Sequence, residues 1–222
     1  MGPPGVGKGT QAELLCEKLL TRHLSTGDLF RAASSDPAPS PAMSAALAAM
    51  RHGDLVSDEV VMSMIRERAG CLQDEGGFLL DGVPRTVCQA KALDALFKEV
   101  NVEIDAVICY DLPLEEIVDR IGGRRTCSVC QAVYHVKARP PSVDGICDQC
   151  GAVLLQRDDD RPEAVRVRMQ AYREATEPLI QFYSERGQLI SVSADGAPEA
   201  ILDATLLSLK QHLLQKPQQA ST

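Results

Sequence analysis

The first ten residues contain the residue types that bind phosphate groups. Gly2, Gly7 and Lys8 match the pattern G-x-x-x-x-G-K of a phosphate-binding loop. Such glycines let successive backbone N–H groups turn toward one centre, where the positive end of the following helix and the lysine charge attract an anion. Two features depart from the common pattern, because the hydroxyl residue Thr10 comes one position late and only Met1 precedes the loop. An accidental glycine-rich turn therefore remains an alternative for this stretch taken alone.

A second chemical pattern lies in the middle of the chain. Four cysteines have the spacing C-x2-C-x16-C-x2-C, and they are Cys127, Cys130, Cys147 and Cys150. Two C-x-x-C turns can each present two thiolates to one tetrahedral ion, and four thiolates leave no open position for a substrate. The pattern predicts a structural zinc site, with redox-active pairs and a nucleic-acid-binding zinc ribbon as alternatives. The acidic chain argues against the ribbon.

Arginines flank the cysteine segment on both sides. Those before it are Arg120, Arg124 and Arg125, and those after it are Arg157, Arg161, Arg166 and Arg168. An arginine on a helix can simply pair with a neighbouring carboxylate, and we adopt this interpretation for Arg161 and Arg166. For Arg124, Arg157 and Arg168 we expect ligands of phosphate instead. One well-placed arginine can contribute roughly 10³–10⁵ to the rate of phosphoryl transfer.

Asp81 follows a short apolar run that has the pattern of a buried parallel strand. Nucleotide-binding folds place a carboxylate at this position, facing magnesium. The alternative is an aspartate that only caps the next helix. We predict that Asp81 binds magnesium through an intervening water molecule.

The helices and strands that must position these residues are predicted to alternate along the chain. Apolar periodicity and turn signals predict helices over 9–20, 28–52 (interrupted by the proline-rich stretch 36–41), 57–69, 87–97, 114–121, 162–172 and 199–214, and strands over 77–81, 106–111 and 189–193. This alternation predicts an α/β fold with a parallel sheet covered by helices on both faces. Two segments, 25–56 and 123–160, interrupt it where loops leave the carboxyl ends of strands, and such sheets bind ligands there.

Composition limits the class of protein. A chain of 222 residues with 45% hydrophobic residues forms one domain carrying insertions, so we expect a single core over 1–222. The formal charge of −8 argues against a general nucleic-acid-binding protein. No run of 18 apolar residues and no signal-peptide pattern is visible, so we expect a cytoplasmic protein that binds no membrane.

Four motifs together resemble the adenylate kinases. They are the loop from Gly2 to Gln11, Ser-Thr-Gly-Asp-Leu-Phe-Arg at 25–31, Phe-Leu-Leu-Asp-Gly-Val-Pro-Arg at 78–85, and Asp-Arg-Ile-Gly-Gly-Arg at 119–124. The resemblance runs in order from residue 2 to about residue 214. It makes Gly-Lys-Gly-Thr the family's own form of the loop, and 123–160 resembles the zinc-bearing LID insertion of the long-form members. Segment 25–56 then corresponds to the insertion that binds the nucleoside monophosphate (the NMP insertion).

The resemblance also implies roles for individual residues. Those implied for ATP are Gly5, Val6, Gly7, Lys8, Gly9, Thr10, Arg120, Arg124, Val133, Tyr134 and Pro198. Those implied for AMP are Thr26, Arg31, Leu55, Val56, Gly82, Arg85, Gln89, Arg157 and Arg168. The catalytic residues would be Lys8, Arg85, Arg124, Arg157 and Arg168. Gln89 would bind the edge of the AMP base, and hydrogen-bonded base selection discriminates strongly.

The implied activity is reversible transfer of the terminal phosphoryl group from ATP, bound with magnesium, to AMP, which gives two ADP. The partners are therefore these nucleotides, and we expect a monomer. A kinase for UMP, CMP or GMP and a non-catalytic nucleotide-binding zinc protein are the alternatives.

The fold of this family has one more strand than the sequence provides. Its first strand lies between two others in the sheet and ends at the phosphate-binding loop, where this sequence has only Met1. A missing central strand leaves neighbouring strand edges unpaired. We therefore expect an apolar stretch upstream of Gly2 in the complete protein.

Overall fold

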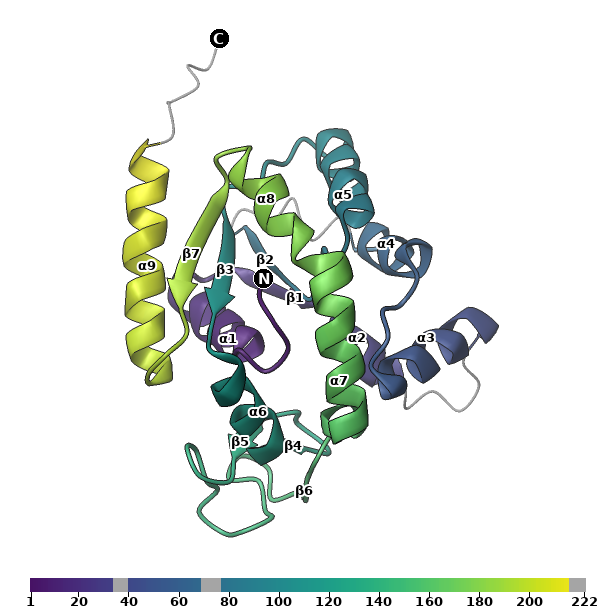
Figure 1. The fold of residues 1–222 in the computed structure, drawn as a ribbon, viewed down its shortest axis with the longest axis vertical. Coiled ribbons are helices and arrows are strands. Elements are labelled where there is room, and N and C mark those ends of the chain that lie inside the picture. The colour runs from purple at the N-terminus through teal and green to yellow at the C-terminus, as the bar shows by residue number, and fades with distance from the viewer. Residues whose placement is uncertain (34–39, 69–76, 216–222) are drawn as a thin grey trace.

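The computed structural model describes residues 1–33, 40–68 and 77–215 (Figure 1). The elements of its first half are α1 (Lys8–Leu19), β1 (Arg22–Ser25), α2 (Thr26–Ala33), α3 (Pro41–His52), α4 (Asp58–Arg66), β2 (Phe78–Asp81), α5 (Val87–Glu99), β3 (Val107–Asp111) and α6 (Leu114–Gly123). The second half contains β4 (Arg124–Cys127), β5 (Val133–His135), β6 (Leu154–Leu155), a 3-10 turn (Asp158–Asp160), α7 (Pro162–Ala171), a π-helical turn (Tyr172–Thr176), α8 (Pro178–Ser184), β7 (Leu189–Ser193) and α9 (Pro198–Gln215).

The strands of the core are all parallel, which confirms the predicted α/β class. They form two hydrogen-bonded pairs instead of one continuous sheet. In the first pair β1 lies along β2, with Leu24 opposite Leu80, and in the second β3 lies along β7, with Cys109 opposite Ser191. The helices lie on both sides of these strands, with α9 beside β7 and α5 and α8 on the other side (Figure 1).

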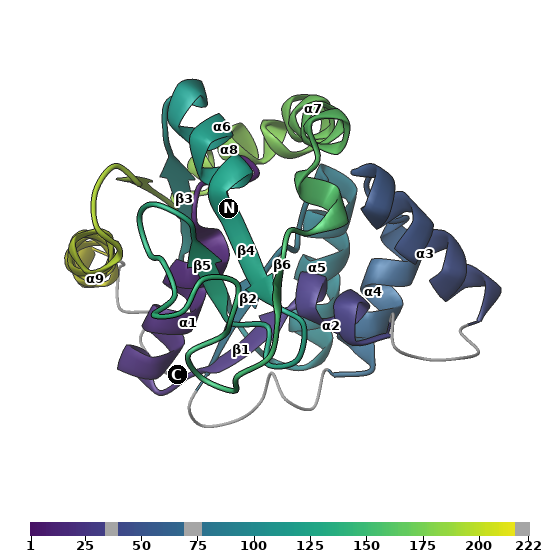
Figure 2. The same cartoon turned by 90° about the horizontal axis from the view of Figure 1, so that it is seen from below.

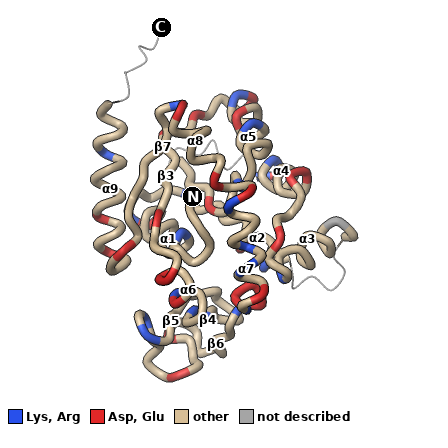
Figure 3. Tube along the Cα trace, in the orientation of Figure 1, with Lys and Arg blue, Asp and Glu red and all other residues tan. Residues whose placement is uncertain are grey.

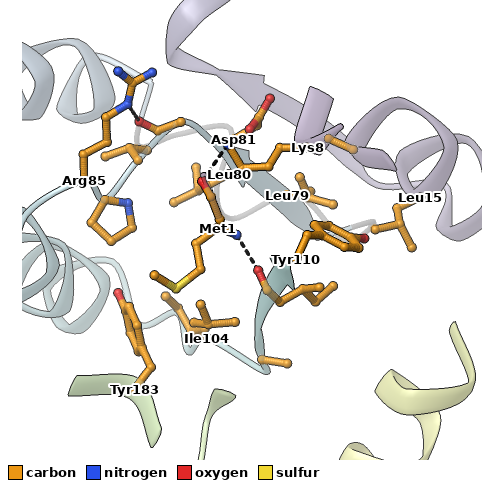
Figure 4. Close-up of a pocket in the computed structure, with 18 of the residues that line it drawn as sticks. Met1, Lys8, Leu15, Leu79, Leu80, Asp81, Arg85, Ile104, Tyr110 and Tyr183 are labelled. Carbon is orange, nitrogen blue, oxygen red and sulfur yellow. Dashed lines mark hydrogen bonds between the residues drawn. The ribbon is translucent and has the colours of Figure 1, made fainter. Parts of the chain in front are cut away.

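Between the two pairs lies a cavity of about 640 Å³ that we call the slot (Figure 4). Leu79 and Leu80 of β2 line it on one side, and Ile108 and Tyr110 of β3 on the other. Met1 enters the slot as a strand residue would: its N-terminal nitrogen donates to the Ile108 carbonyl, and the Tyr110 N–H donates to the Met1 carbonyl at 3.0 Å. These two bonds, which flank Cys109, have the pattern of a parallel ladder.

The helices bury their apolar faces against the strands as the periodicity predicts. In α5, for example, Ala90, Leu93 and Phe97 recur at helical spacing and are 0%, 0% and 3% exposed. Two of the buried clusters that result involve the core strands and several helices. One joins β1 and β2 to α4 and α5, and the other joins β3 and β7 to α6 and α9.

The two predicted insertions contain separate elements. Segment 25–56 holds α2 and α3, and 123–160 holds β4, which pairs antiparallel with both β5 and β6. Seen from below, β4–β6 lie across the end of the molecule toward which β3 points (Figures 1 and 2).

Several sequence predictions differ from the structure. The predicted helix 28–52 forms as α2 and α3, and most of its proline-rich interruption lies outside the described residues. Residues 57–69 are helical only as far as Arg66 in α4, and residues 69–76 are not described. Neither β1 nor α8 was predicted from the sequence. No helix in the described ranges is long and apolar enough to span a bilayer.

Candidate active site

The glycines of the loop adopt backbone conformations that other residues avoid. Gly5 has φ 82° and Gly7 has φ 101°, both in the left-handed region. A Cβ on Gly5 would lie 2.4 Å from Cγ1 of Ile121, so a side chain there would also collide with α6. Gly7 occupies the N-cap position of α1, and the loop therefore leads directly into the N-terminal end of that helix. This geometry suits an anion.

Lys8, the first residue of α1, is held inside the loop. Its Nζ donates to the carbonyls of Gly2 and Pro3, at 2.7 Å each. Burial lowers the pKa of Lys8 to about 7, and nearby arginines, Arg85 foremost, contribute in the same direction. Without an anion, this ammonium group is therefore readily deprotonated near neutral pH.

A cavity of about 900 Å³ opens beside the loop. Predicted site residues that line it are Gly5, Val6, Gly7, Lys8, Gly9, Thr10, Arg31, Asp81, Gly82, Arg85, Arg120, Arg124, Val133, Tyr134, Arg157, Arg168 and Pro198. They come from α1, α2, α6, α7, both insertions and the loops after β2 and β7. The structure thus brings most of the predicted residues together around one space.

Arg124 and Arg168 are bound to carboxylates, a pairing that was not predicted from the sequence, and their binding to phosphate stays a prediction. Arg124 makes two bonds to Asp160, of which Nε to Oδ2 is 2.7 Å. Arg168 Nη1 lies 3.2 Å from Asp160 and 3.0 Å from Asp159. The cause is that the Asp160 side chain is fully buried, and a buried carboxylate requires charged partners. Both arginines still line the cavity.

Arg157 differs from these two arginines. Its Nε donates to the Thr126 hydroxyl at 2.8 Å, and it forms no ion pair within the described part of the chain. Burial lowers the pKa of Arg157 to about 9, with further lowering by Arg124 and Arg31. A phosphate group entering the cavity would relieve this repulsion between cations. Figure 3 shows how closely basic and acidic positions lie around the start of α7.

Asp81 lies at the end of β2 and faces the start of α1. A Cβ on Gly9 would be 3.7 Å from its Oδ2, and His23 Nε2 is 3.8 Å away. Burial alone would raise the pKa of Asp81, but His23 and Lys8 more than offset this and hold it below its usual value. The N-cap of α5 is Thr86, which excludes the alternative that Asp81 caps this helix.

Four predicted AMP residues do not line this cavity. Thr26 is 3% exposed and donates its hydroxyl to the Asp81 carbonyl at 3.3 Å. Val56 packs in the apolar core, and Leu55 lines the slot. Gln89 is 1% exposed, and its amide is hydrogen-bonded to Arg85 and to an acidic residue of α4 that the sequence analysis did not single out, Asp58.

The four predicted metal ligands come together in the segment 123–160. Their sulfur atoms all lie within 4.8 Å of one another, with Cys127 and Cys150 at 3.4 Å and Cys130 and Cys147 at 3.5 Å. A tetrahedral ion with bonds of about 2.3 Å to sulfur needs S–S separations of about 3.8 Å. The cluster fits such an ion. Tyr134 also belongs to it, because its hydroxyl lies 3.6 Å from Cys147 Sγ.

Carboxylates that hold the arginines were not predicted as site residues. Residues 158–160 are three consecutive aspartates, and Asp158 is exposed whereas Asp160 is buried. Only the 3-10 turn formed by these residues decides which one faces inward. The sole available signal was an acidic run between two arginines.

A glycine loop at the N-terminus of a helix, beside parallel strands and facing several buried arginines, defines a class of protein. These features are those of a P-loop phosphotransferase, in which backbone N–H groups, a lysine and arginines surround the transferred phosphoryl group.

Comparisons with known proteins specify the family. The family model described as "Adenylate kinase" matches residues 1–188. Among curated proteins, an adenylate kinase of Desulforamulus reducens is 45% identical over 210 residues, covering 95% of this chain and 98% of the relative. An adenylate kinase of Anaeromyxobacter dehalogenans is 46% identical over 205 residues, covering 92% and 95%. The chain belongs to the adenylate kinase family.

Proposed function

We propose that the chain transfers the terminal phosphoryl group of ATP, bound with magnesium, to AMP and thereby forms two ADP. The observation that carries the proposal is the convergence of Lys8 and four arginines, Arg85, Arg124, Arg157 and Arg168, on the cavity beside the loop. Cations around one space stabilise the charge that develops on a transferred phosphoryl group, and phosphoryl transfer requires little else from a protein.

The donor would lie against the loop. Backbone N–H groups from Gly5 to Thr10 would bind its phosphates, and Lys8 would contact the phosphoryl group that is transferred. Arg120 supports this side, because its guanidinium donates to the carbonyls of Val6 and Ala194, at 3.3 and 2.8 Å, and so lies between the loop and the segment after β7. Arg124, Val133, Tyr134 and Pro198 complete the ATP residues in this proposal.

The acceptor would lie on the opposite side. Arg31 and Arg85 would bind the AMP phosphate near Gly82, with Thr26, Leu55, Val56 and Gln89 around the nucleoside, and Arg157 and Arg168 would contact both phosphate chains. Arg85 is already directed by its Nε bond to the Gly82 carbonyl at 2.9 Å (Figure 4). A guanidinium held in one orientation loses little freedom when phosphate binds.

The metal ions have separate roles in this proposal. Magnesium enters with ATP, and Asp81 would reach it through a water molecule. Zinc would occupy the four-cysteine cluster and stabilise the LID insertion without taking part in the reaction. The NMP and LID insertions would close over the two substrates and exclude water, since hydrolysis of ATP would otherwise compete. We further propose a cytoplasmic monomer that does not bind nucleic acid.

Measuring the acceptor preference tests the proposed function. With ATP and magnesium, AMP should give rapid ADP formation, whereas UMP, CMP and GMP should each have at least about tenfold lower kcat/KM, because their bases present different hydrogen-bonding edges. The matched control is ATP without an acceptor, which should show little hydrolysis. A higher kcat/KM for another monophosphate would show that AMP is not the preferred acceptor. Nucleotide binding without turnover would contradict the proposed kinase activity itself.

The lowered pKa of Lys8 leads to a second expectation. Near pH 7.5 the side chain is mostly neutral in the free protein, since its pKa is about 7. Bound phosphates favour the charged form, so ATP binding should be accompanied by the uptake of up to one proton at this side chain. Calorimetry in buffers of different ionisation enthalpy measures the uptake. Equal uptake by the wild type and by Lys8→Met would show that the proton binds elsewhere.

A further inference from the structure

One carboxylate joins the N-terminal ends of two neighbouring helices. Asp58 is the first residue of α4, and Thr86 is the N-cap of α5. Asp58 Oδ2 accepts a hydrogen bond from the Thr86 hydroxyl at 3.0 Å, and its Oδ1 accepts one from Nε2 of Gln89 at 2.8 Å. Both carboxylate oxygens of Asp58 therefore bind residues at the start of α5. Neither of these two hydrogen bonds is to the backbone of α4, the helix that Asp58 begins.

The same contacts fix the orientation of the Gln89 side-chain amide, that is, which way its oxygen and its nitrogen face. Its Oε1 accepts from the backbone N–H of Arg85 at 2.7 Å, and its Nε2 donates to Asp58. A backbone N–H can only donate and a carboxylate only accepts, so exchanging the oxygen and nitrogen of the amide would break both bonds. Because Gln89 is 1% exposed, this orientation is set by the protein before any ligand arrives.

An amide held in this way keeps one acceptor lone pair on Oε1 and one N–H on Nε2. These two positions are buried in the present structure, and in the proposed complex with AMP they would match the edge of adenine, which offers an amino N–H at position 6 and an acceptor at N1. Hypoxanthine offers the reverse, with a carbonyl oxygen at position 6 and an N–H at N1. A fixed amide therefore favours 6-aminopurines, whereas an amide free to turn over would accept both bases.

We propose that Asp58 is a positioning residue that determines the base preference of the acceptor site by holding Nε2 of Gln89. It acts through Gln89 and does not touch the nucleotide. This inference deepens the proposed function, because it rests on AMP as acceptor and on Gln89 as the side chain that binds its base.

A second contact between α4 and α5 provides a control that distinguishes positioning of Gln89 by Asp58 from a merely structural role of Asp58. At the opposite ends of the same two helices, Arg66, the last residue of α4, pairs with Glu99, the last residue of α5, at 2.8 Å. Arg66→Gln removes a charged contact between α4 and α5 far from Gln89. Asp58→Ala removes the acceptor of Gln89, and Asp58→Asn retains one, because its amide oxygen can accept from Gln89 while its NH₂ donates to Thr86.

The experiment compares kcat and KM for AMP and for IMP, whose base is hypoxanthine, in the wild type and these three variants. Asp58→Ala should raise the KM for AMP about tenfold and lower the AMP/IMP ratio of kcat/KM about tenfold, the effect of one hydrogen bond to a charged group. The KM for ATP should stay unchanged. Asp58→Asn should restore most of the ratio, and Arg66→Gln should keep it while lowering the melting temperature slightly.

A folded Asp58→Ala variant with the wild-type AMP/IMP ratio would overturn the proposal, as would an equal loss of that ratio in Arg66→Gln. Calorimetric affinities for AMP and IMP provide the same comparison without turnover. If the wild type binds AMP more tightly than IMP but forms no ADP, the proposed activity fails while Asp58 is still tested by binding. If it binds neither monophosphate, both proposals are wrong.

Discussion

Lys8→Met should reduce the rate of ADP formation about 10²–10³-fold, the range seen when one preorganised group that stabilises transition-state charge is removed. Methionine keeps most of the apolar length of the side chain but cannot carry charge. It also leaves the carbonyls of Gly2 and Pro3 without their present donor. Initial rates at saturating ATP and AMP measure the effect, and the loss should appear mainly in kcat.

Lys18→Met is the matched control for this variant. Lys18 lies on the same helix, in its last turn, and is exposed to solvent. Its loss should leave kcat within about twofold of the wild type, as expected for a surface substitution away from the site. A Lys8→Met variant that keeps more than a third of the wild-type rate would remove Lys8 from the mechanism.

Removing the metal from the four-cysteine cluster should unfold the LID insertion. The buried residues of its apolar core are Cys127, Tyr134, Cys147 and Leu154, and two of these belong to the proposed metal site. Units below about 40 residues rarely bury enough surface to fold without a metal or disulfides. We expect one zinc per chain by elemental analysis, and a fall of about 10 °C or more in melting temperature after chelation, with a loss of kcat/KM for ATP.

Two cysteine variants separate the metal site from general thiol effects. Cys130→Ser should lose the metal and melt at the lower temperature even without chelator. Cys88→Ser should behave as the wild type, because Cys88 is an exposed cysteine of α5, outside the cluster. Identical melting curves with and without chelator would contradict a stabilising metal.

Local patterns predicted those parts of the fold that depend on neighbours in sequence. The alternation that places β7 at 189–193 and the spacing of the four cysteines both correspond to the structure. Each of these patterns is short, so the residues that form it lie within a single strand, for β7, or within a single turn, for each C-x-x-C pair. The gap in the sheet, which leaves the described core strands in two pairs, depends on backbone bonds between segments far apart in sequence. It was expected only from the fold of the family and not from a local pattern.

The arrangement of the charges could not be predicted for the same reason. Sequence identifies Arg124 and Arg168 as cations near a phosphate site, but their partner Asp160 is distinguished from Asp158 only by the direction of one turn. The contact of Asp58 with Gln89 joins residues 31 positions apart. Such contacts follow from how α4 packs on α5, which no local pattern encodes.

From the contacts that Asp58 and Arg66 make between α4 and α5 we expect part of the chain to move with the core and part to move separately. Asp58 fastens one end of α4 and Arg66 the other, so α4 should follow the core as a rigid body. The pivot for any swing of α2 and α3 must then lie before Asp58. Gly53, at the end of α3 with φ 97°, and the non-helical residues 54–57 are suited to this role. The acceptor base would thus be bound by a stationary α4–α5 pair, while the moving part of the insertion closes over it.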